Sequence, residues 1–539
     1  MKSELKILNK ENLTSLNYQL ESHEIPIQIP DRKIFDLPEK VLILGNNKLL
    51  RSTIDYFFNV SIINEEFKGR IIHVELENEE IVDTLNKQNC LFTLFSRGLK
   101  GDKVEERWDI IASINQIIIA SQWDKVIKSA INPNIEILIC HHQNHIKLLD
   151  HNDSIKKKPP NSYIGKILSI LYERYRRFKS KDQKFTVISL NPKLQGDLTL
   201  KEIILNIGKE WNLGETFLSW IRLKVNFFNS LLDKLDIGIL PNNEKIIQYN
   251  KLNYKDNFLT VTENYHKLII KKEDQKIYFP IPETDLNFEY TKNLDIFTSL
   301  NTWFNAVLVA FIPLAYLSGY NKTNEALMDL IIKEFFEKFL FDTIKRFVDL
   351  PEEQIQEWEK NTISRLKNPF NTRTLIEMSE NLLQKFKSDF LFKMIDLYEK
   401  DKEIPDYIFF ILAIFIKFYN VIEEEDGQFI GIRNLQDVKQ DEEIDEENEI
   451  QRENRDMYKI IDDPIILKEF ASTWRNVTIH DSKSIKIFLG YILTQQNIWG
   501  MDLSLWPKLM ERTNFYLERL LQEDIGKITS ELLLGIEKG

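Results

Sequence analysis

The sequence predicts an α/β domain followed by an all-α domain, and three observations support this fold class. A short apolar run ending in a glycine, residues 41–45, precedes a helical segment and a second apolar run at 71–76. Similar short runs recur as far as residue 190. After about residue 290 the pattern changes to long segments with a helical period. Short apolar runs that alternate with helices are typical of a parallel sheet with helices on both faces, whereas a sustained period of 3.6 is typical of helices alone.

The α/β domain is expected over residues 1–285. Its first strand is VLILG, which ends at Gly45, and the helical segment LLRSTIDYFFNV follows. The next strand begins at Ile71. Further strands are expected at 116–120, 136–140 and 185–190, with helices at 163–178 and 199–212. Helical connections between strands favour a parallel sheet.

The all-α domain is expected over residues 286–539. Its helices are predicted at 296–319, 324–348, 352–365, 372–399 and 406–421. Residues 423–455 are dominated by acidic and polar side chains and hold only scattered apolar ones. We expect this stretch to be a mobile surface insertion, because it has too few apolar residues to form a core.

Composition excludes several classes of function. The 539 residues carry 71 basic against 83 acidic side chains, a net charge of −12, which argues against nucleic-acid partners. Two cysteines, Cys90 and Cys140, are too few for a disulfide framework and indicate a reducing compartment, so we expect a cytoplasmic protein. The apolar windows 304–320 and 407–416 are shorter than a clean membrane span, so we expect buried helices and no membrane partner.

The stretch 41–58 resembles the opening of the tagaturonate reductase branch of the mannitol dehydrogenase family. The matching positions are Gly45, Leu50, Arg51 and Asp55. The resemblance continues in order through segments that begin at Leu85, Leu91, Lys201, Glu210, Asn229, Thr262, Ile312 and Asn368. It covers about residues 40–480, so it does not rest on a single short motif.

The resemblance implies an NAD-linked oxidoreductase with a Rossmann-like N-terminal domain and a helical C-terminal domain. Its substrate would be a small sugar acid or polyol, such as tagaturonate, altronate or mannitol, reacting in the cleft between the domains without a metal. By the same resemblance the cofactor-binding residues are Gly45, Asn47, Lys48, Arg51 and Glu75. The substrate-binding residues are Asn229, Asp233, Arg373 and Asn381, and the catalytic candidates are Asn305, Lys385 and His141.

The helix at 296–309 departs from the family pattern, in which a lysine, an asparagine and a histidine follow at spacings of five and three. Without gaps these positions fall on Leu300, Asn305 and Leu308. A one-turn insertion matches Asn301 instead, with Ile296 and Phe304 at the other two positions.

In either register no lysine or histidine occurs between Lys292 and Lys322. Losing a general acid typically costs about 100- to 10,000-fold in rate. Two hypotheses therefore stay open. One is a diverged tagaturonate reductase, and the other is a non-catalytic descendant that binds a ligand or a partner.

Other family positions have changed as well. Asn47 replaces a glycine that lets the backbone approach the pyrophosphate, and the adjacent Lys48 offers a point charge for phosphate. His141 stands where the family has an asparagine, and Arg373 where it has a histidine. Lys385 and Asn381 are one helical turn apart, so they form either part of the site or a surface polar pair.

Four histidines gather beside Cys140, at 141, 142, 145 and 151. His141 and His145 have the i, i+4 spacing that brings two imidazoles to one metal if the segment is helical. We expect a polar loop at the edge of the sheet, with a metal site as the alternative.

Overall fold

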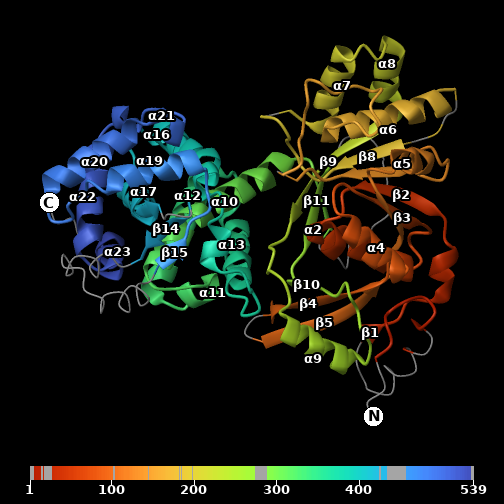
Figure 1. Ribbon diagram of the computed structural model, residues 1–539, viewed down its shortest axis with the longest axis horizontal. Helices are drawn as coiled ribbons and strands as arrows, with labels where there is room; N and C mark the ends of the chain where they lie inside the picture. Colours follow the sequence, from red (N-terminus) through yellow and green to blue (C-terminus); the bar gives the residue numbers. More distant parts are fainter. Residues whose placement is uncertain are drawn as a thin grey trace. The chain divides into compact units, whose positions relative to one another are not determined.

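The computed structural model describes residues 5–13, 16, 27–100, 103–143, 145–180, 183, 185–196, 198–272, 288–423, 427–433 and 457–535. The chain forms two compact units, Met1–Thr298 and Ser299–Gly539 (Figure 1). The expected boundary at 285/286 lies within residues 273–287, outside the described part.

The first unit is built on an eight-stranded sheet. Its order is β12-β11-β9-β8-β7-β2-β3-β6, and the six strands from β9 to β6 are all parallel. β11 runs antiparallel to β9 and parallel to β12. The bounds are β2 (Glu39–Leu44), β3 (Arg70–Glu75), β6 (Ile114–Ile119), β7 (Ile137–Cys140), β8 (Phe185–Ser189), β9 (Val225–Asp233), β11 (Lys267–Lys271) and β12 (Phe288–Thr291).

Both faces of this sheet are buried, which explains why its strands are continuous apolar runs. Leu42 and Leu44 belong to one core and Val41 and Ile43 to another, because successive side chains of a strand point to opposite faces. The first face carries α5 (Trp123–Ala130), α6 (Tyr163–Phe178), α7 (Leu200–Glu210) and α8 (Glu215–Lys224) (Figure 1). The second carries α2 (Lys48–Leu50), the π-helical turn η2 (Arg51–Asp55), α3 (Tyr56–Ile63) and α4 (Glu79–Lys87).

A second sheet of four strands, which we did not expect, packs into the same core as α3. Its order is β1-β5-β4-β10, with β1 (Ile27–Gln28), β5 (Lys103–Ile111), β4 (Phe92–Lys100) and β10 (Thr260–Thr262). The short helix η1 (Arg32–Asp36) and α9 (Asn242–Leu252) complete this unit.

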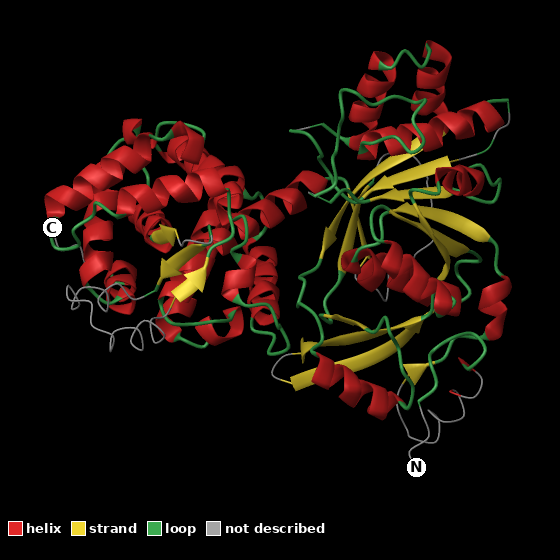
Figure 2. Ribbon diagram, in the orientation of Figure 1, coloured by secondary structure: helices red, strands yellow, loops and turns green. Residues whose placement is uncertain are grey.

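The second half is mostly helical, as predicted (Figure 2). α10 (Leu294–Leu317) begins in the first unit and continues into the second. The remaining helices are α11 (Thr323–Ala326), α12 (Leu330–Phe347), α13 (Glu352–Leu366), α14 (Leu375–Met378), α15 (Leu382–Lys385), the π-helical turn η3 (Phe386–Leu391), α16 (Phe392–Asp401), α17 (Asp406–Phe418), α19 (Pro464–Trp474), α20 (Ser482–Thr494), α21 (Gln496–Trp499), η5 (Leu503–Leu505), α22 (Leu509–Gln522) and α23 (Ile525–Leu533).

This half also holds a three-stranded antiparallel sheet that the periodicity does not predict. It consists of β13 (Val421–Glu423), β14 (Phe429–Ile432) and β15 (Met457–Lys459). β14 falls inside the stretch 423–455 expected to be an insertion, and its Phe429 and Ile432 are buried, so this part of the expectation is corrected. Residues 424–426 and 434–456 lie outside the described residues.

Among the described helices, α10 alone is long and apolar enough to cross a membrane. Of its apolar window, 78% is buried inside the protein, as in the core helix of a globular domain. The second apolar window lies in α17, a helix of 13 residues that is buried from Ile408 to Phe418.

Candidate functional site

The carboxyl ends of β2 and β7 form the point at which the parallel sheet reverses its strand order. After β2 the chain proceeds outward to β3 and β6, then returns to β7 on the other side of β2. In open α/β sheets ligands bind in the crevice at this switch point. Gly45 follows β2 there with a φ of +125°, and a Cβ at this residue would lie 3.3 Å from Leu50 and 3.7 Å from the His141 carbonyl oxygen. The tight turn therefore requires glycine.

Buried side chains hold the carbonyl groups of this glycine loop. His73 Nδ1 lies 2.8 Å from the Gly45 oxygen, while Nε2 of the same ring lies 2.8 Å from Asp55 Oδ1. Arg51 Nη1 donates to the Asn46 oxygen at 2.8 Å. Burial lowers the pKa of Arg51 to about 10, so it stays a cation at neutral pH, assisted by Asp55 and Glu75. Asn46 is 4% exposed, and its Nδ2 has no hydrogen-bond partner among the described residues, so the loop keeps a buried donor for a ligand.

The helix after the loop positions these groups through an irregularity. α2, the turn η2 and α3 are consecutive and run from Lys48 to Ile63. The π-helical turn contains both Arg51 and Asp55, which are buried. Such turns widen a helix by one residue and recur at functional sites.

Lys48 is turned toward the segment after β9. Its Nζ lies 2.6 Å from Asp236 Oδ1 and also donates to the Gly238 carbonyl oxygen. The ammonium thus already has a counterion, which is a structural alternative to the phosphate contact predicted for it.

Glu75 ends β3, the strand next to β2. Its Oε1 accepts the backbone N–H groups of Leu76, Glu77 and Asn78 at 2.9, 3.2 and 3.3 Å. The residue is 8% exposed. The carboxylate is thus fixed at the strand end where dinucleotide-binding folds place the acid that accepts ribose hydroxyls.

His141 contacts the start of the first helix. Its Nδ1 lies 3.0 Å from Asn47 Nδ2, and burial, with a contribution from His142, lowers its pKa to about 4. The described residues between 141 and 151 contain no helix, so the i, i+4 spacing of His141 and His145 does not bring their rings together. His142 bonds the Ile146 carbonyl at 2.7 Å, and His145 lies 3.6 Å from Glu77. Within the described residues no three metal-ligating side chains gather at one point.

The ends of β8 and β9 carry the next group of predicted residues. Asn229, on β9, is half-buried and pairs with Ser189 of β8 in the sheet. Asp233 ends β9, and its Oδ2 accepts a hydrogen bond from Tyr265 Oη at 3.4 Å. Lys234 Nζ donates to the carbonyl groups of Ser52, Glu263 and Tyr265 at 3.3 to 3.4 Å. It therefore ties the turn after β9 to the first helix.

In the second unit, Asn305 lies half-buried on α10. Asn301 and Leu308 are also half-buried and share its helical face, whereas Leu300 is 2% exposed. The position at which the resemblance predicts a lysine is therefore the core side chain Leu300 in the register without gaps, or the half-buried Ile296 in the alternative register.

Arg373, Asn381 and Lys385 lie around α14 and α15. Asn381 and Lys385 are exposed, and Arg373 is half-buried. Partial burial, with Arg373 as the next cause, lowers the pKa of Lys385. Arg373 Nη2 donates to the Glu377 carbonyl at 3.3 Å, next to the Met378 carbonyl that Lys385 contacts. Lys385 Nζ donates to the Glu380 and Met378 carbonyls at 2.9 and 3.3 Å. Asn381 precedes α15 in the left-handed conformation with a φ of +53°. The structure therefore brings together Arg373 and Lys385, which sequence reasoning selected separately.

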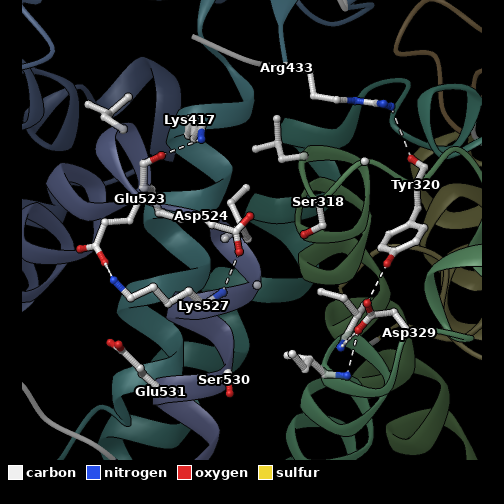
Figure 3. Close-up of a pocket in the computed structure, with 18 residues that line it drawn as sticks. Ser318, Tyr320, Asp329, Lys417, Arg433, Glu523, Asp524, Lys527, Ser530 and Glu531 are labelled. Atoms are coloured by element: carbon white, nitrogen blue, oxygen red, sulfur yellow. Dashed lines mark hydrogen bonds and ion pairs between the residues drawn. The ribbon is translucent and has the colours of Figure 1, made fainter. Parts of the chain in front are cut away.

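The second unit also contains a cavity of about 870 Å³, lined by parts of α10, α12, α17 and α23 (Figure 3). Its polar groups largely satisfy one another. Tyr320 Oη donates to Asp329 at 2.7 Å, Lys527 lies 2.8 Å from Glu523, and Lys417 donates to the Leu520 carbonyl at 2.7 Å. It contains none of the residues predicted for the site, so we place the chemistry elsewhere.

Sequence reasoning missed His73 and Asn46. His73 occupies an ordinary position in an apolar strand, and its contacts at Gly45 and Asp55 depend on the path of the first helix. A histidine within an apolar strand could have indicated such contacts, because a fully buried histidine needs hydrogen-bond partners for both ring nitrogens.

The doubly wound sheet and the glycine loop at its switch point define the Rossmann class of dinucleotide-binding folds. Two family models match this chain. The mannitol dehydrogenase Rossmann domain matches residues 39–281, and the mannitol dehydrogenase C-terminal domain matches residues 302–478. The chain belongs to the mannitol dehydrogenase family.

Relatives and solved structures agree with this assignment. The chain is 26% identical over 506 residues to an altronate oxidoreductase of Halalkalibacterium halodurans, covering 93% of this chain and 94% of the relative. It is 24% identical to that of Bacillus subtilis, covering 90% and 93%. Its fold is similar to Pseudomonas fluorescens mannitol 2-dehydrogenase, solved as a ternary complex with NAD and D-mannitol, with a TM-score of 0.72, 17% identity, and coverage of 98% and 100%.

Proposed function

We propose that this protein is an NAD-dependent oxidoreductase of sugar acids or polyols, and specifically that it reduces tagaturonate to altronate or acts on a related keto sugar acid. The observation that carries the proposal is the glycine loop at the switch point, whose carbonyls are held by His73 and Arg51 beside the fixed carboxylate of Glu75. The altronate oxidoreductases that resemble this chain over most of its length support the substrate class. We expect the reaction to take place in the cytoplasm.

The residues present fit a dinucleotide. Gly45 allows the tight turn of the loop at a φ that other residues rarely adopt, and Asn46 keeps a buried donor without a partner among the described residues. Glu75 would accept the ribose hydroxyls, and Arg51 would place positive charge near the phosphates. When bound, NADH supplies the hydride that reduces the substrate carbonyl.

The substrate then needs an anchor for its carboxylate and a proton for its new hydroxyl. We assign Arg373 and Asn381 to the carboxylate, Asn229 and Asp233 to hydroxyl groups, and Asn305 to a hydrogen bond with the reacting oxygen. Lys385 is our candidate for the proton donor, because burial and Arg373 lower the pKa of its ammonium. A lowered pKa brings a lysine closer to the acid strength that proton transfer at neutral pH requires.

A second candidate function is a non-catalytic descendant that binds a ligand or a partner. The observation that favours it is α10, which has a buried Leu300 in place of the family lysine and no lysine or histidine between 292 and 322. Without that acid we expect turnover about 100- to 10,000-fold below that of a relative that retains it.

The test is NADH fluorescence titration of the whole protein, followed by absorbance of the reduced nicotinamide with tagaturonate or fructuronate. Binding with turnover supports the oxidoreductase, and Lys385→Met should then abolish turnover without changing NADH affinity, with the exposed Lys360→Met as control. Binding without turnover supports the second candidate. Absence of NADH binding overturns the first proposal.

A further inference from the structure

The contact between Asn47 and His141 determines which nitrogen of the histidine carries its proton. Asn47 is the N-cap of α2, and its Oδ1 accepts the Leu50 N–H at 2.8 Å. An atom that faces an N–H group must be the amide oxygen, so the other amide atom, Nδ2, is the donor that faces His141 Nδ1 at 3.0 Å. Nδ1 is therefore the acceptor, and a neutral His141 carries its proton on Nε2.

His141 is neutral under ordinary conditions, because burial lowers its pKa to about 4. Nδ1 is occupied by Asn47. No hydrogen bond to Nε2 is found among the described residues, and the side chain is half-buried beside the glycine loop. A neutral N–H donor that has no acceptor within the described part of the chain thus lies at the switch point of the sheet, where a ligand is expected.

From this geometry we infer that Asn47 is a positioning residue, which holds His141 as the Nε2–H tautomer so that it donates a hydrogen bond to an oxygen atom of the bound dinucleotide. The inference rests on the proposed nucleotide binding. It gives Asn47 and His141 one joint role in nucleotide binding, whereas the family resemblance assigned Asn47 to the cofactor and His141 to catalysis. The Asn47 side chain occupies space that a glycine would leave open to the phosphates. In this arrangement Asn47 and His141 together provide the Nε2–H group as a hydrogen-bond donor.

The tautomer is measured first, on the protein without nucleotide. Nitrogen-15 NMR of histidine-labelled protein should show His141 with a protonated Nε2 and a bare Nδ1, its signal assigned as the one missing in His141→Leu. Asn47→Asp keeps the N-cap oxygen but turns an acceptor toward Nδ1, so the proton should move to Nδ1. A wild-type His141 protonated on Nδ1 overturns the inference.

The ligand contact is measured second, by NADH titration. His141→Leu should weaken NADH binding about 10- to 100-fold, the loss typical of a hydrogen bond to a charged group. Asn47→Ser keeps a capping oxygen, adds no charge and removes the donor to His141, so it should weaken binding less than His141→Leu does. His145→Leu, in the same loop and exposed, should have no effect.

The outcomes separate this inference from the function it rests on. Unchanged NADH affinity in His141→Leu overturns the inference and leaves the oxidoreductase intact. Failure of the wild type to bind NADH overturns both. The expected tautomer together with weakened binding in His141→Leu supports both.

Discussion

At the scale of single residues, His73 shows how a buried polar group organises the glycine loop. Both His73 and Asp55 are fully buried, and the two ring nitrogens face the Gly45 carbonyl and the Asp55 carboxylate. The buried ring thus links the loop carbonyl to the helix that follows it through two polar contacts, so removing either partner would leave a buried polar atom without a hydrogen bond.

Asp55→Asn tests this pair. It removes the fully buried carboxylate that faces His73 Nε2 and also acts as a counterion of the buried Arg51 guanidinium, so we expect the free energy of unfolding to fall by about 3 to 5 kcal/mol. Urea denaturation at pH 7 measures it, with the exposed Asp124→Asn as control. A loss below about 1 kcal/mol would mean that the charge of Asp55 contributes little to the stability of the folded protein.

Glu75→Gln tests the choice of nucleotide. The amide oxygen keeps the three backbone N–H groups satisfied but removes the charge that repels a 2′-phosphate. We expect NADH binding to weaken about tenfold and the preference for NADH over NADPH to fall by about as much or more. The exposed Glu77→Gln is the matched control. An unchanged preference would show that Glu75 only supports the turn after β3.

The sequence identified the residues whose position along the chain determines their role. Gly45 and His141 each follow a strand and Glu75 ends one, and the carboxyl ends of parallel strands meet at one edge of the sheet. The contacts of Lys48 with Asp236 and of His73 with Asp55 depend on where distant segments lie, which periodicity does not encode. The sequence alone therefore revealed the strand-end positions and missed the partners that fix them.

At the scale of elements, the five strands predicted for the parallel sheet are all present, whereas the helix predicted at 372–399 is divided into α14, α15, the π-helical turn η3 and α16. The bounds of α6 agree with the predicted 163–178, because its apolar stripe is regular and Ser162 caps its start. β5 was missed because it has three exposed residues at its start and lacks a continuous apolar run, and its partner β4 was missed with it. β14 was missed because its four residues lie within a polar stretch, and pairing with β13 and β15 holds it as a strand.

The contact of α13 with α12 makes stability depend on pH. Burial, with Glu337 as the next cause, raises the pKa of Glu359 to about 7. A carboxyl whose pKa is raised in the folded state binds more protons there, so stability falls as pH rises from about 4.5 to 7. We therefore expect Glu359→Gln to raise the melting temperature at pH 8 and to leave it unchanged near pH 4.5.

Glu357→Gln, on the exposed side of the same helix, should change the melting temperature equally little at both pH values. Scanning calorimetry of the three proteins gives the comparison. If Glu359→Gln raised the melting temperature equally at pH 4.5 and pH 8, the ionisation of Glu359 would not contribute to the pH dependence of stability.

At the scale of the whole molecule, the nucleotide loop and the candidate proton donor belong to different compact units, Met1–Thr298 and Ser299–Gly539. The two-domain division follows from the change of periodicity after residue 290. The activity does not follow from this division, because one fold serves many reactions and α10 contains neither a lysine nor a histidine.

Hydrogen exchange separates the responses of the two units. NADH at about 100 times its dissociation constant should stabilise the unit that binds it by about 2.7 kcal/mol. We expect slower exchange in peptides from β2 and β7 and little change in those from α20. If NADH slowed hydrogen exchange equally in the peptides from β2, β7 and α20, the nucleotide could not be assigned to the first unit alone.

The bond between Lys48 and Asp236 joins residues that are 188 positions apart, and that between Asn47 and His141 spans 94. Contacts of such long range form late, because closing a long loop costs entropy before any other contact compensates for it. During synthesis, β2 and its helix emerge well before these partners do. The glycine loop therefore reaches its final geometry only when the turn after β9 has docked, so nucleotide binding would report complete folding of the first unit.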